Sequence, residues 1–200
     1  MRRVPLYVSV FLVGFSVMGF EMTASRLIVP WFGGGIDTWA ALISTVLTGL
    51  TLGYFAGAAM PLRWKTPERV AIVLLAAAFY MALVPLLNGH ILRAVSDTVG
   101  EGALPLLLST TLVCFVPITL LGIFAPCSVD LMDQLEPRHK PGQIAGQLYG
   151  ISTLGSVCGT LGTAFALIPS FGSSTIVLLL AAMTFAAAAL LWIHPANRRA

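Results

Sequence analysis

The apolar residues of this chain gather into six blocks of about 20 residues each, with proline, glycine and charged residues between them. A helix rises 1.5 Å per residue, so ~20 residues cross a hydrocarbon core of about 30 Å. Hydrophobic residues make up 58% of the chain and charged residues 10%, whereas a soluble domain carries about 25% charged residues. The pattern predicts membrane-spanning helices and excludes a water-soluble domain.

Helix-ending residues stand between the blocks. Pro30 with residues 33–35 ends the first block, and residues 88–89, Asn-Gly, close the third. Two stretches of mixed apolar and charged residues, 91–101 and 128–136, predict short helices along the membrane surface. We expect an all-α integral membrane protein whose residues 1–200 form one six-helix bundle. The expected spans are residues 4–26, 38–61, 69–88, 103–125, 144–168 and 174–194.

The distribution of lysine and arginine predicts the orientation. Short cytoplasmic loops carry an excess of these residues. With the N-terminus inside, nine of the 11 Lys and Arg residues lie on the cytoplasmic side, and Arg26 and Arg93 lie outside. We therefore expect both termini in the cytoplasm and the chain in the cell (inner) membrane. The nine cytoplasmic residues are Arg2, Arg3, Arg63, Lys65, Arg69, Arg138, Lys140, Arg198 and Arg199.

Rows of small residues predict where the helices pack. In lipid there is little hydrophobic force between helices, and small residues allow their backbones to approach closely. The second span has Gly49, Gly53 and Gly57 at four-residue intervals, and the fifth has Gly155 and Gly159 among serine and threonine. We expect these two spans to occupy the centre of the bundle.

Four polar residues are candidates for substrate binding. Glu21 is the one acidic residue within a predicted span, and an intramembrane carboxylate is costly unless it is functional or paired. Arg26 lies about 140° around the helix, so pairing with Glu21 requires unwinding towards Pro30. Ligand or ion binding, a structural ion pair and an interface anchor all remain open for them. Tyr54 and Tyr149 supply hydroxyls either to a cavity between the second and fifth spans or to helix–helix hydrogen bonds.

No catalytic, metal or cofactor site is visible in the sequence. The histidines are far apart, the cysteines form no CxxC motif, and no Ser/His/Asp set can be assembled. The scattered basic residues give no footprint for nucleic acid. The residues in question are His90, His139, His194, Cys114, Cys127 and Cys158.

Four segments of the chain resemble the membrane region of the fused major-facilitator/spermidine-synthase family, also called transmembrane spermidine synthases. The most specific segment contains Tyr149, Thr153, Gly155, Gly159 and Ile-Pro at 168–169, while Ser152 stands where the family usually has Asn. The resemblance implies a bundle like half of a major-facilitator fold. The segments are EMTASRLIVPWFG (21–33), WAALISTVLTGLTLGYFAG (39–57), PITLLGIFAP (117–126) and GQLYGISTLGSVCGTLGTAFALIPSFG (146–172).

Members of that family place an aminopropyltransferase-like domain after the membrane domain. Such a domain needs a strand, a Gly-rich turn for its cofactor and a pair of carboxylates, and this sequence has no Gly-rich turn between a strand and a helix. The chain therefore resembles the membrane domain without its C-terminal enzyme. We expect neither aminopropyl transfer nor another enzymatic activity.

Two functions are compatible with these features. The first is a transporter-type unit for a polyamine-like molecule or another small metabolite, working as a homo-oligomer or with other membrane subunits in the lipid bilayer. The alternative is a non-catalytic anchor or scaffold, either for a separately encoded, soluble aminopropyltransferase-like partner or for a larger membrane complex.

Overall fold

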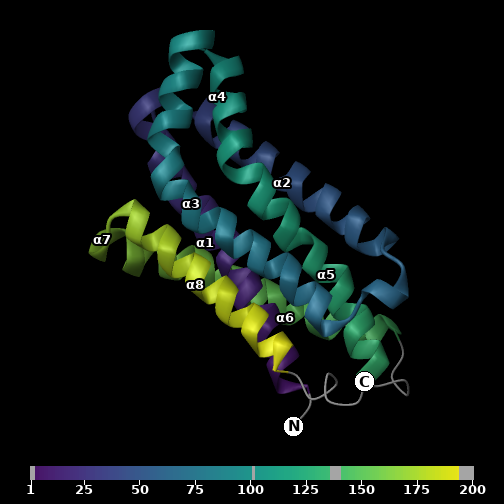
Figure 1. Ribbon diagram of the computed structural model, residues 1–200. Helices are drawn as coiled ribbons and strands as arrows, with labels where there is room; N and C mark the ends of the chain where they lie inside the picture. The colour runs from purple at the N-terminus through teal and green to yellow at the C-terminus, as the bar shows by residue number, and fades with distance from the viewer. Residues whose placement is uncertain (1–2, 101, 136–140, 194–200) are drawn as a thin grey trace.

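The computed structural model describes residues 3–100, 102–135 and 141–193, and all regular structure in these ranges is helical (Figure 1). Six helices are long and apolar enough to cross a membrane. This confirms the prediction of an all-helical chain with six membrane-length helices. The helices are α1 (Val4–Phe32), α2 (Ile36–Ala59), α3 (Pro67–Val99), a fourth made of α4 (Ala103–Thr110), η2 (Thr111–Phe115) and α5 (Val116–Leu135), a fifth made of α6 (Pro141–Gly162), η3 (Thr163–Leu167) and α7 (Ile168–Ser170), and α8 (Ser173–Trp192).

Of the residues expected to end the first helix, the glycines at 33–35 do so and Pro30 does not. Helix α1 continues through this proline to Phe32 and ends at Gly33, whose φ of 81° only glycine adopts easily. A proline inside a helix removes one backbone hydrogen bond. Breaking the helix there would expose several more backbone groups to lipid, so the helix persists to the glycines.

Two expected surface helices are instead extensions of the membrane helices. Helix α3 runs through residues 88–89 to Val99 without a break, and its Leu92 is fully buried. Helix α5 likewise runs to Leu135 and buries Met132. Residues 101 and 136, at the ends of the two stretches, lie outside the described residues. The two stretches mix apolar and charged residues because one face of each helix end packs on the bundle while the other is exposed. They are not separate helices on the membrane surface.

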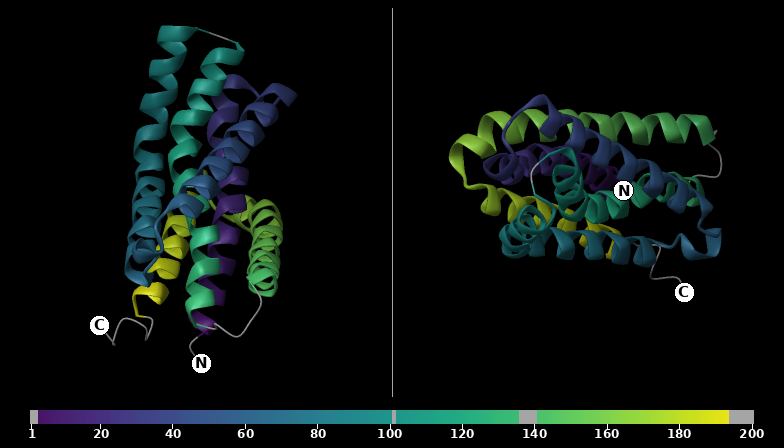
Figure 2. Two further views of the ribbon diagram at one scale, coloured as in Figure 1. Left: turned by 90° about the vertical axis from the view of Figure 1, so that its right-hand side faces the viewer. Right: turned by 90° about the horizontal axis from the view of Figure 1, so that it is seen from above.

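Helix α1 occupies the centre of the bundle. It packs against α6, α8, α2 and α5, while α3 packs against α8 and α5. Viewed from above, α6 lies at one edge of the molecule and α3 at the opposite edge (Figure 2). The expectation that the second and fifth spans are central is wrong. Of the most apolar 18 residues in each helix, 17% are buried in the fifth helix and 39% in α2, against 50% in α1.

The glycines of α6 bring its backbone against that of α1. A Cβ atom built on Gly155 would overlap the carbonyl oxygen of Phe11, and one built on Gly159 would overlap that of Phe15. In return, Gly14 of α1 faces the backbone of Ser152. The Oγ atom of Ser156 donates a hydrogen bond of 3.2 Å to the carbonyl oxygen of Gly14. The two helices therefore touch through their main chains.

The glycines of α2 make an equivalent contact with α5. A Cβ atom on Gly53 would overlap the carbonyl oxygen of Thr119 and lie 2.8 Å from Cα of Gly122. One on Gly57 would lie 2.7 Å from Cγ of Pro126. The third glycine of the row, Gly49, is also buried on α2. The two glycine rows thus pack against α1 and α5, and not against each other.

Candidate functional site

A cavity lies between α2, α5 and α6, with α1 behind it. Its outer part has a volume of about 550 Å³ and is lined by Tyr54 and Phe55 of α2 and by Tyr149, Ser152 and Thr153 of α6, among others. A smaller hollow of about 80 Å³ adjoins it and reaches Val13 and Gly14 of α1. The two parts share Tyr54, Ala125, Tyr149, Ser152 and Ser156.

The cavity forms because the glycine rows of α2 and α6 face different helices, α5 and α1, and not each other. Gly53 allows the backbone of α2 to pack closely on α5, and Gly155 allows that of α6 to pack closely on α1. Tyr54 follows Gly53 directly, and Ser152 precedes Gly155 by three residues, so both side chains lie beside their contact and face the space between the helices. The small residues that seal α2 to α5 and α6 to α1 therefore leave α2 and α6 apart.

Four hydroxyl groups in the cavity have no hydrogen-bond partner among the described residues. Tyr54, Tyr149, Ser152 and Thr153 make no hydrogen bond to any group in residues 3–100, 102–135 and 141–193. Many other hydroxyls of these helices bond to a carbonyl oxygen one turn earlier, as Thr160 does with Ser156. Ser16, Ser109 and Thr163 are also unpaired within the described residues, but they are buried outside the cavity, one side chain at a time. An unpaired hydroxyl in an apolar environment costs several kcal/mol. The four hydroxyls therefore favour contact with a polar solute or with water.

The cavity offers hydrogen bonds and aromatic surface but no charge. None of the described residues that line either part of it is Asp, Glu, Lys or Arg. Tyr54 lies five residues before the end of α2, and Tyr149 eight residues after the start of α6. At 1.5 Å per residue these positions are about 8 and 12 Å from that end of the bundle. The cavity thus occupies the half of the bundle nearest the start of α1.

The two charged candidates, Glu21 and Arg26, lie elsewhere. Glu21 is half-buried on α1, near the thiol of Cys114 in η2, and Arg26 is exposed. No ion pair joins them within the described part of the chain, since α1 stays helical through Pro30 and holds them on different faces. Neither lines the cavity. The structure therefore brings together the two tyrosines of the four candidates and separates them from the charged pair.

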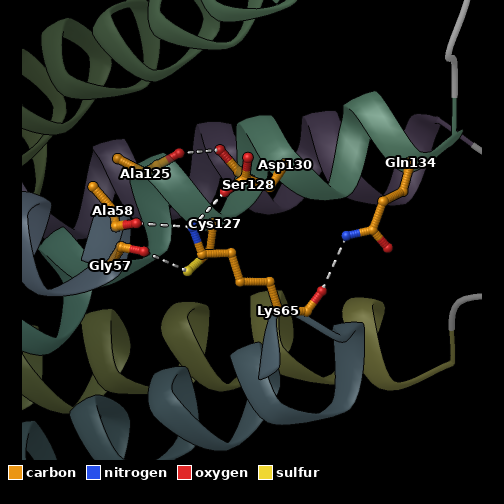
Figure 3. Close-up of polar contacts among 8 residues, drawn as sticks. All are labelled: Gly57, Ala58, Lys65, Ala125, Cys127, Ser128, Asp130 and Gln134. Atoms are coloured by element: carbon orange, nitrogen blue, oxygen red, sulfur yellow. Dashed lines mark hydrogen bonds and ion pairs between the residues drawn. The ribbon is translucent and has the colours of Figure 1, made fainter. Parts of the chain in front are cut away.

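A buried ion pair that sequence reasoning missed lies at the end of the bundle near the cavity (Figure 3). Lys65, in the connection after α2, has 4% of its side chain exposed, and its Nζ atom lies 2.6 Å from Oδ2 of Asp130 on α5. The same Nζ donates to the carbonyl oxygen of Ala58 at 3.3 Å. Nε2 of Gln134 donates to the carbonyl oxygen of Lys65 at 3.4 Å. These bonds fasten the connection between α2 and α3 to α5.

Within the described residues, no three His, Cys, Asp or Glu side chains are placed to hold a metal ion. No protein-family model, curated protein or solved structure matches this chain. The cavity and its unpaired hydroxyls are therefore the features from which a function can be inferred.

Proposed function

We propose that this protein is a membrane transport unit that carries a small molecule through the cavity between α2, α5 and α6. The observation that carries the proposal is the group of four unpaired hydroxyls on membrane-length helices. Placing such groups against lipid is unfavourable, whereas a polar solute or water satisfies them. A volume of about 550 Å³ lies in the range of small-molecule sites.

The lining favours an uncharged or singly charged molecule with both apolar and hydrogen-bonding groups. A polyamine carries several positive charges, and each would require a carboxylate or a comparable partner in a site of low dielectric constant. The tyrosine rings supply at most a cation–π contact to one ammonium group. The polyamine-like substrate expected from the sequence therefore draws little support from this cavity.

The pairing of the helices supports a bundle like half of a major-facilitator fold, in which two three-helix units are related by a pseudo-two-fold axis. If the first, second and third helices are exchanged with the fourth, fifth and sixth, α1 takes the place of α5 and α2 that of α6. The contact between α1 and α6 then becomes the contact between α5 and α2. The exchange also turns α1–α8 into α5–α3, and all four contacts are present. The glycine rows follow the same relation, because α6 packs on α1 as α2 packs on α5. We therefore retain as a proposal the relation to the membrane domain of transmembrane spermidine synthases.

We propose further that both termini face the cytoplasm and that the chain lies in the inner membrane. Arg3, Arg63, Lys65 and Arg69 lie where α1 and α3 begin and α2 ends, which is one end of the bundle. The positive-inside rule favours that end in the cytoplasm. A membrane-impermeant thiol reagent added to intact cells should label Arg93→Cys but not Arg63→Cys, both with Cys158 replaced by alanine. Labelling of Arg63→Cys alone would reverse the orientation.

A membrane anchor or scaffold for a separately encoded enzyme or complex is the second candidate. It is favoured by the uncharged lining, because the described lining residues include no Asp, Glu, His, Lys or Arg that could couple transport to an ion gradient. It is also favoured by the large exposed surface of α6. In both readings we assign the chain no catalytic step of its own.

Thiol accessibility in proteoliposomes separates the two candidates without knowledge of the substrate. The parent is Cys158→Ala, because the other two cysteines, Cys114 and Cys127, are buried. Ser152→Cys places a thiol in the cavity, and Leu154→Cys places one two residues away on the exposed surface of the same helix. A water-soluble, charged methanethiosulfonate should modify Ser152→Cys from each side of the membrane in turn and leave Leu154→Cys unmodified.

The transport proposal is rejected if Ser152→Cys is as inert as the control, or if it reacts from one side alone. A stoichiometric partner recovered with such an inert protein would support the scaffold. Uptake of labelled spermidine tests the substrate class separately, and we expect it to equal that of empty liposomes.

A further inference from the structure

Helix α6 carries a second glycine row that no other described residue of the protomer covers. A Cβ atom built on Gly146 or Gly150 would have no atom within 4 Å, whereas Gly155 and Gly159 are covered by the backbone of α1. The two open glycines are four residues apart and lie on one side of the helix. In a membrane helix, a shallow groove of this kind suits the close approach of another helix.

The open glycines share their face with cavity hydroxyls. At 100° per residue, Gly146, Tyr149, Gly150 and Thr153 fall within an arc of about 100°. All four are exposed, and the hydroxyls of Tyr149 and Thr153 are unpaired within the described residues. The outer part of the cavity opens onto this face. If lipid covered it, both hydroxyls would remain unsatisfied, so the site is incomplete in a single protomer.

Helix α2 lies on the other side of the same opening and carries protruding apolar side chains that could fill such a groove. Phe55 has 69% of its side chain exposed and Leu47 has 57%. They share a face with Thr48 and Thr51, whose hydroxyls bond to carbonyl oxygens of α2 itself. Phe55 lines the same cavity as Tyr149, so it lies at about the depth of the open glycines. One chain thus presents a protruding ring and a glycine groove at one level of the membrane.

We infer that a second copy of this chain covers the opening, with a two-fold axis along the membrane normal beside the cavity. This inference rests on the proposed function and names the partner that completes its site. Such an axis keeps every residue at its own depth and pairs the surface with itself. Phe55 of each protomer then packs into the groove at Gly146 and Gly150 of its partner. Because ring and groove belong to one chain, a second copy uses both, whereas an unrelated helix would fill only one.

The dimer also closes the cavity against lipid. The two openings face each other across the axis, so the hydroxyls of Tyr149 and Thr153 from both protomers border one enclosed space. A solute in that space contacts hydroxyls on two sides, and no polar group of this face remains in the hydrocarbon.

Disulfide cross-linking between differently tagged copies tests the contact. Phe55→Cys in one copy and Gly146→Cys in the other, both with Cys158→Ala, are co-expressed and oxidised in native membranes. We expect a covalent dimer that contains both tags. The matched control replaces Phe55→Cys with Phe79→Cys, on α3 at the opposite edge, whose ring is 67% exposed. The control pair should stay monomeric.

The strength of the dimer is the second readout. Gly146→Leu meets open space within the protomer, so it should leave the fold intact while filling the groove. Subunit proximity measured by energy transfer in proteoliposomes should show dimerisation weakened about tenfold or more. Gly89→Leu, an equally open glycine on α3, should have no effect. An unchanged dimer in Gly146→Leu, or a wild-type protein that stays monomeric, overturns the inference.

The tests separate the dimer from the proposed function. A monomeric protein whose Ser152→Cys variant reacts from both sides keeps the transport function and loses the dimer. A cross-linked dimer with an inert Ser152→Cys keeps the dimer and loses transport. Stable association with a different membrane protein through Gly146, without self-association, rejects the dimer and supports the scaffold.

Discussion

Lys65 donates a hydrogen bond of 2.6 Å to Asp130, and this ion pair joins two segments that lie 65 residues apart in the chain. The lysine side chain is 4% exposed and the aspartate 32%. Burial makes the pair asymmetric, because losing the carboxylate leaves an enclosed ammonium group without its counter-charge.

Asp130→Asn should lower the free energy of unfolding by about 2 kcal/mol. Loss of one partner of a buried pair costs about 3–5 kcal/mol, and the partial exposure of Asp130 reduces this value. Thermal unfolding in detergent measures the change, with Asp133→Asn, an exposed carboxylate three residues on, as the control. The double variant Lys65→Met/Asp130→Leu should recover most of the loss. Equal melting temperatures for Asp130→Asn and Asp133→Asn would show that the ion pair contributes nothing to stability.

Gly159→Ala should separate α6 from α1. The added Cβ atom overlaps the carbonyl oxygen of Phe15, a backbone atom that cannot rotate away. We expect a loss of about 3 kcal/mol, at the upper end for overpacking, as measured by unfolding in increasing fractions of denaturing detergent. Gly89→Ala, where the Cβ meets open space, is the control and should be neutral or slightly stabilising. Similar stability of both variants would contradict the close backbone contact.

Removing the cavity hydroxyls should change hydration rather than stability. Tyr54→Phe and Tyr149→Phe delete groups that bond to nothing in the described chain, so the unfolding free energy should stay within about 0.5 kcal/mol. Tyr80→Phe is the matched control. Its hydroxyl donates to the carbonyl oxygen of Leu112, so its loss should cost about 1 kcal/mol.

The rate at which a methanethiosulfonate modifies Ser152→Cys should fall severalfold in Tyr149→Phe, because the cavity loses a site that binds water. If Tyr149→Phe leaves the modification rate unchanged and lowers the stability of the protein, the hydroxyl of Tyr149 serves helix packing instead.

Glu21→Gln should leave both stability and access to the cavity intact. The carboxylate is half-buried without a partner in the described residues and lies outside the cavity. Replacing it with a neutral amide removes a desolvation cost, so the melting temperature should hold or rise. The test is melting together with two-sided modification of Ser152→Cys. A loss of reactivity would make Glu21 part of the transport cycle after all.

The sequence predicted the helices better than their partners. Apolar length fixes where a chain must cross a membrane, but a glycine row such as Gly53 and Gly57 indicates only that another backbone comes close. It does not say which one, and α5, not the fifth span, lies there. Pro30 and residues 88–89 were expected to end helices and instead lie within them, because such residues break helices in water, whereas lipid penalises the break itself.

The candidate site was partly foreseeable. Tyr54 and Tyr149 stood out as hydroxyls on glycine-rich spans, and the structure places both on one cavity. Glu21 and Arg26 stood out as charges, yet the continuous helix α1 keeps them apart and away from it. The Lys65–Asp130 pair had no local signal, because it joins a connection to a helix that lies 65 residues further along the chain.

The five-residue segment η3, Thr163–Leu167, is a single turn of π-helix. Its hydrogen bonds reach one residue further than those of an α-helix, so the turn holds one residue more than a regular turn. Deleting one residue of this segment would restore an ordinary helical turn and leave the faces of the flanking segments nearly unchanged, so Gly155 and Gly159 would still meet α1. Deleting one residue from the regular helix between Gly159 and Thr163 would instead rotate all that precedes it by about 100° and turn both glycines away from α1. The wall of the cavity therefore tolerates the loss of a residue within the π-turn but not one turn before it.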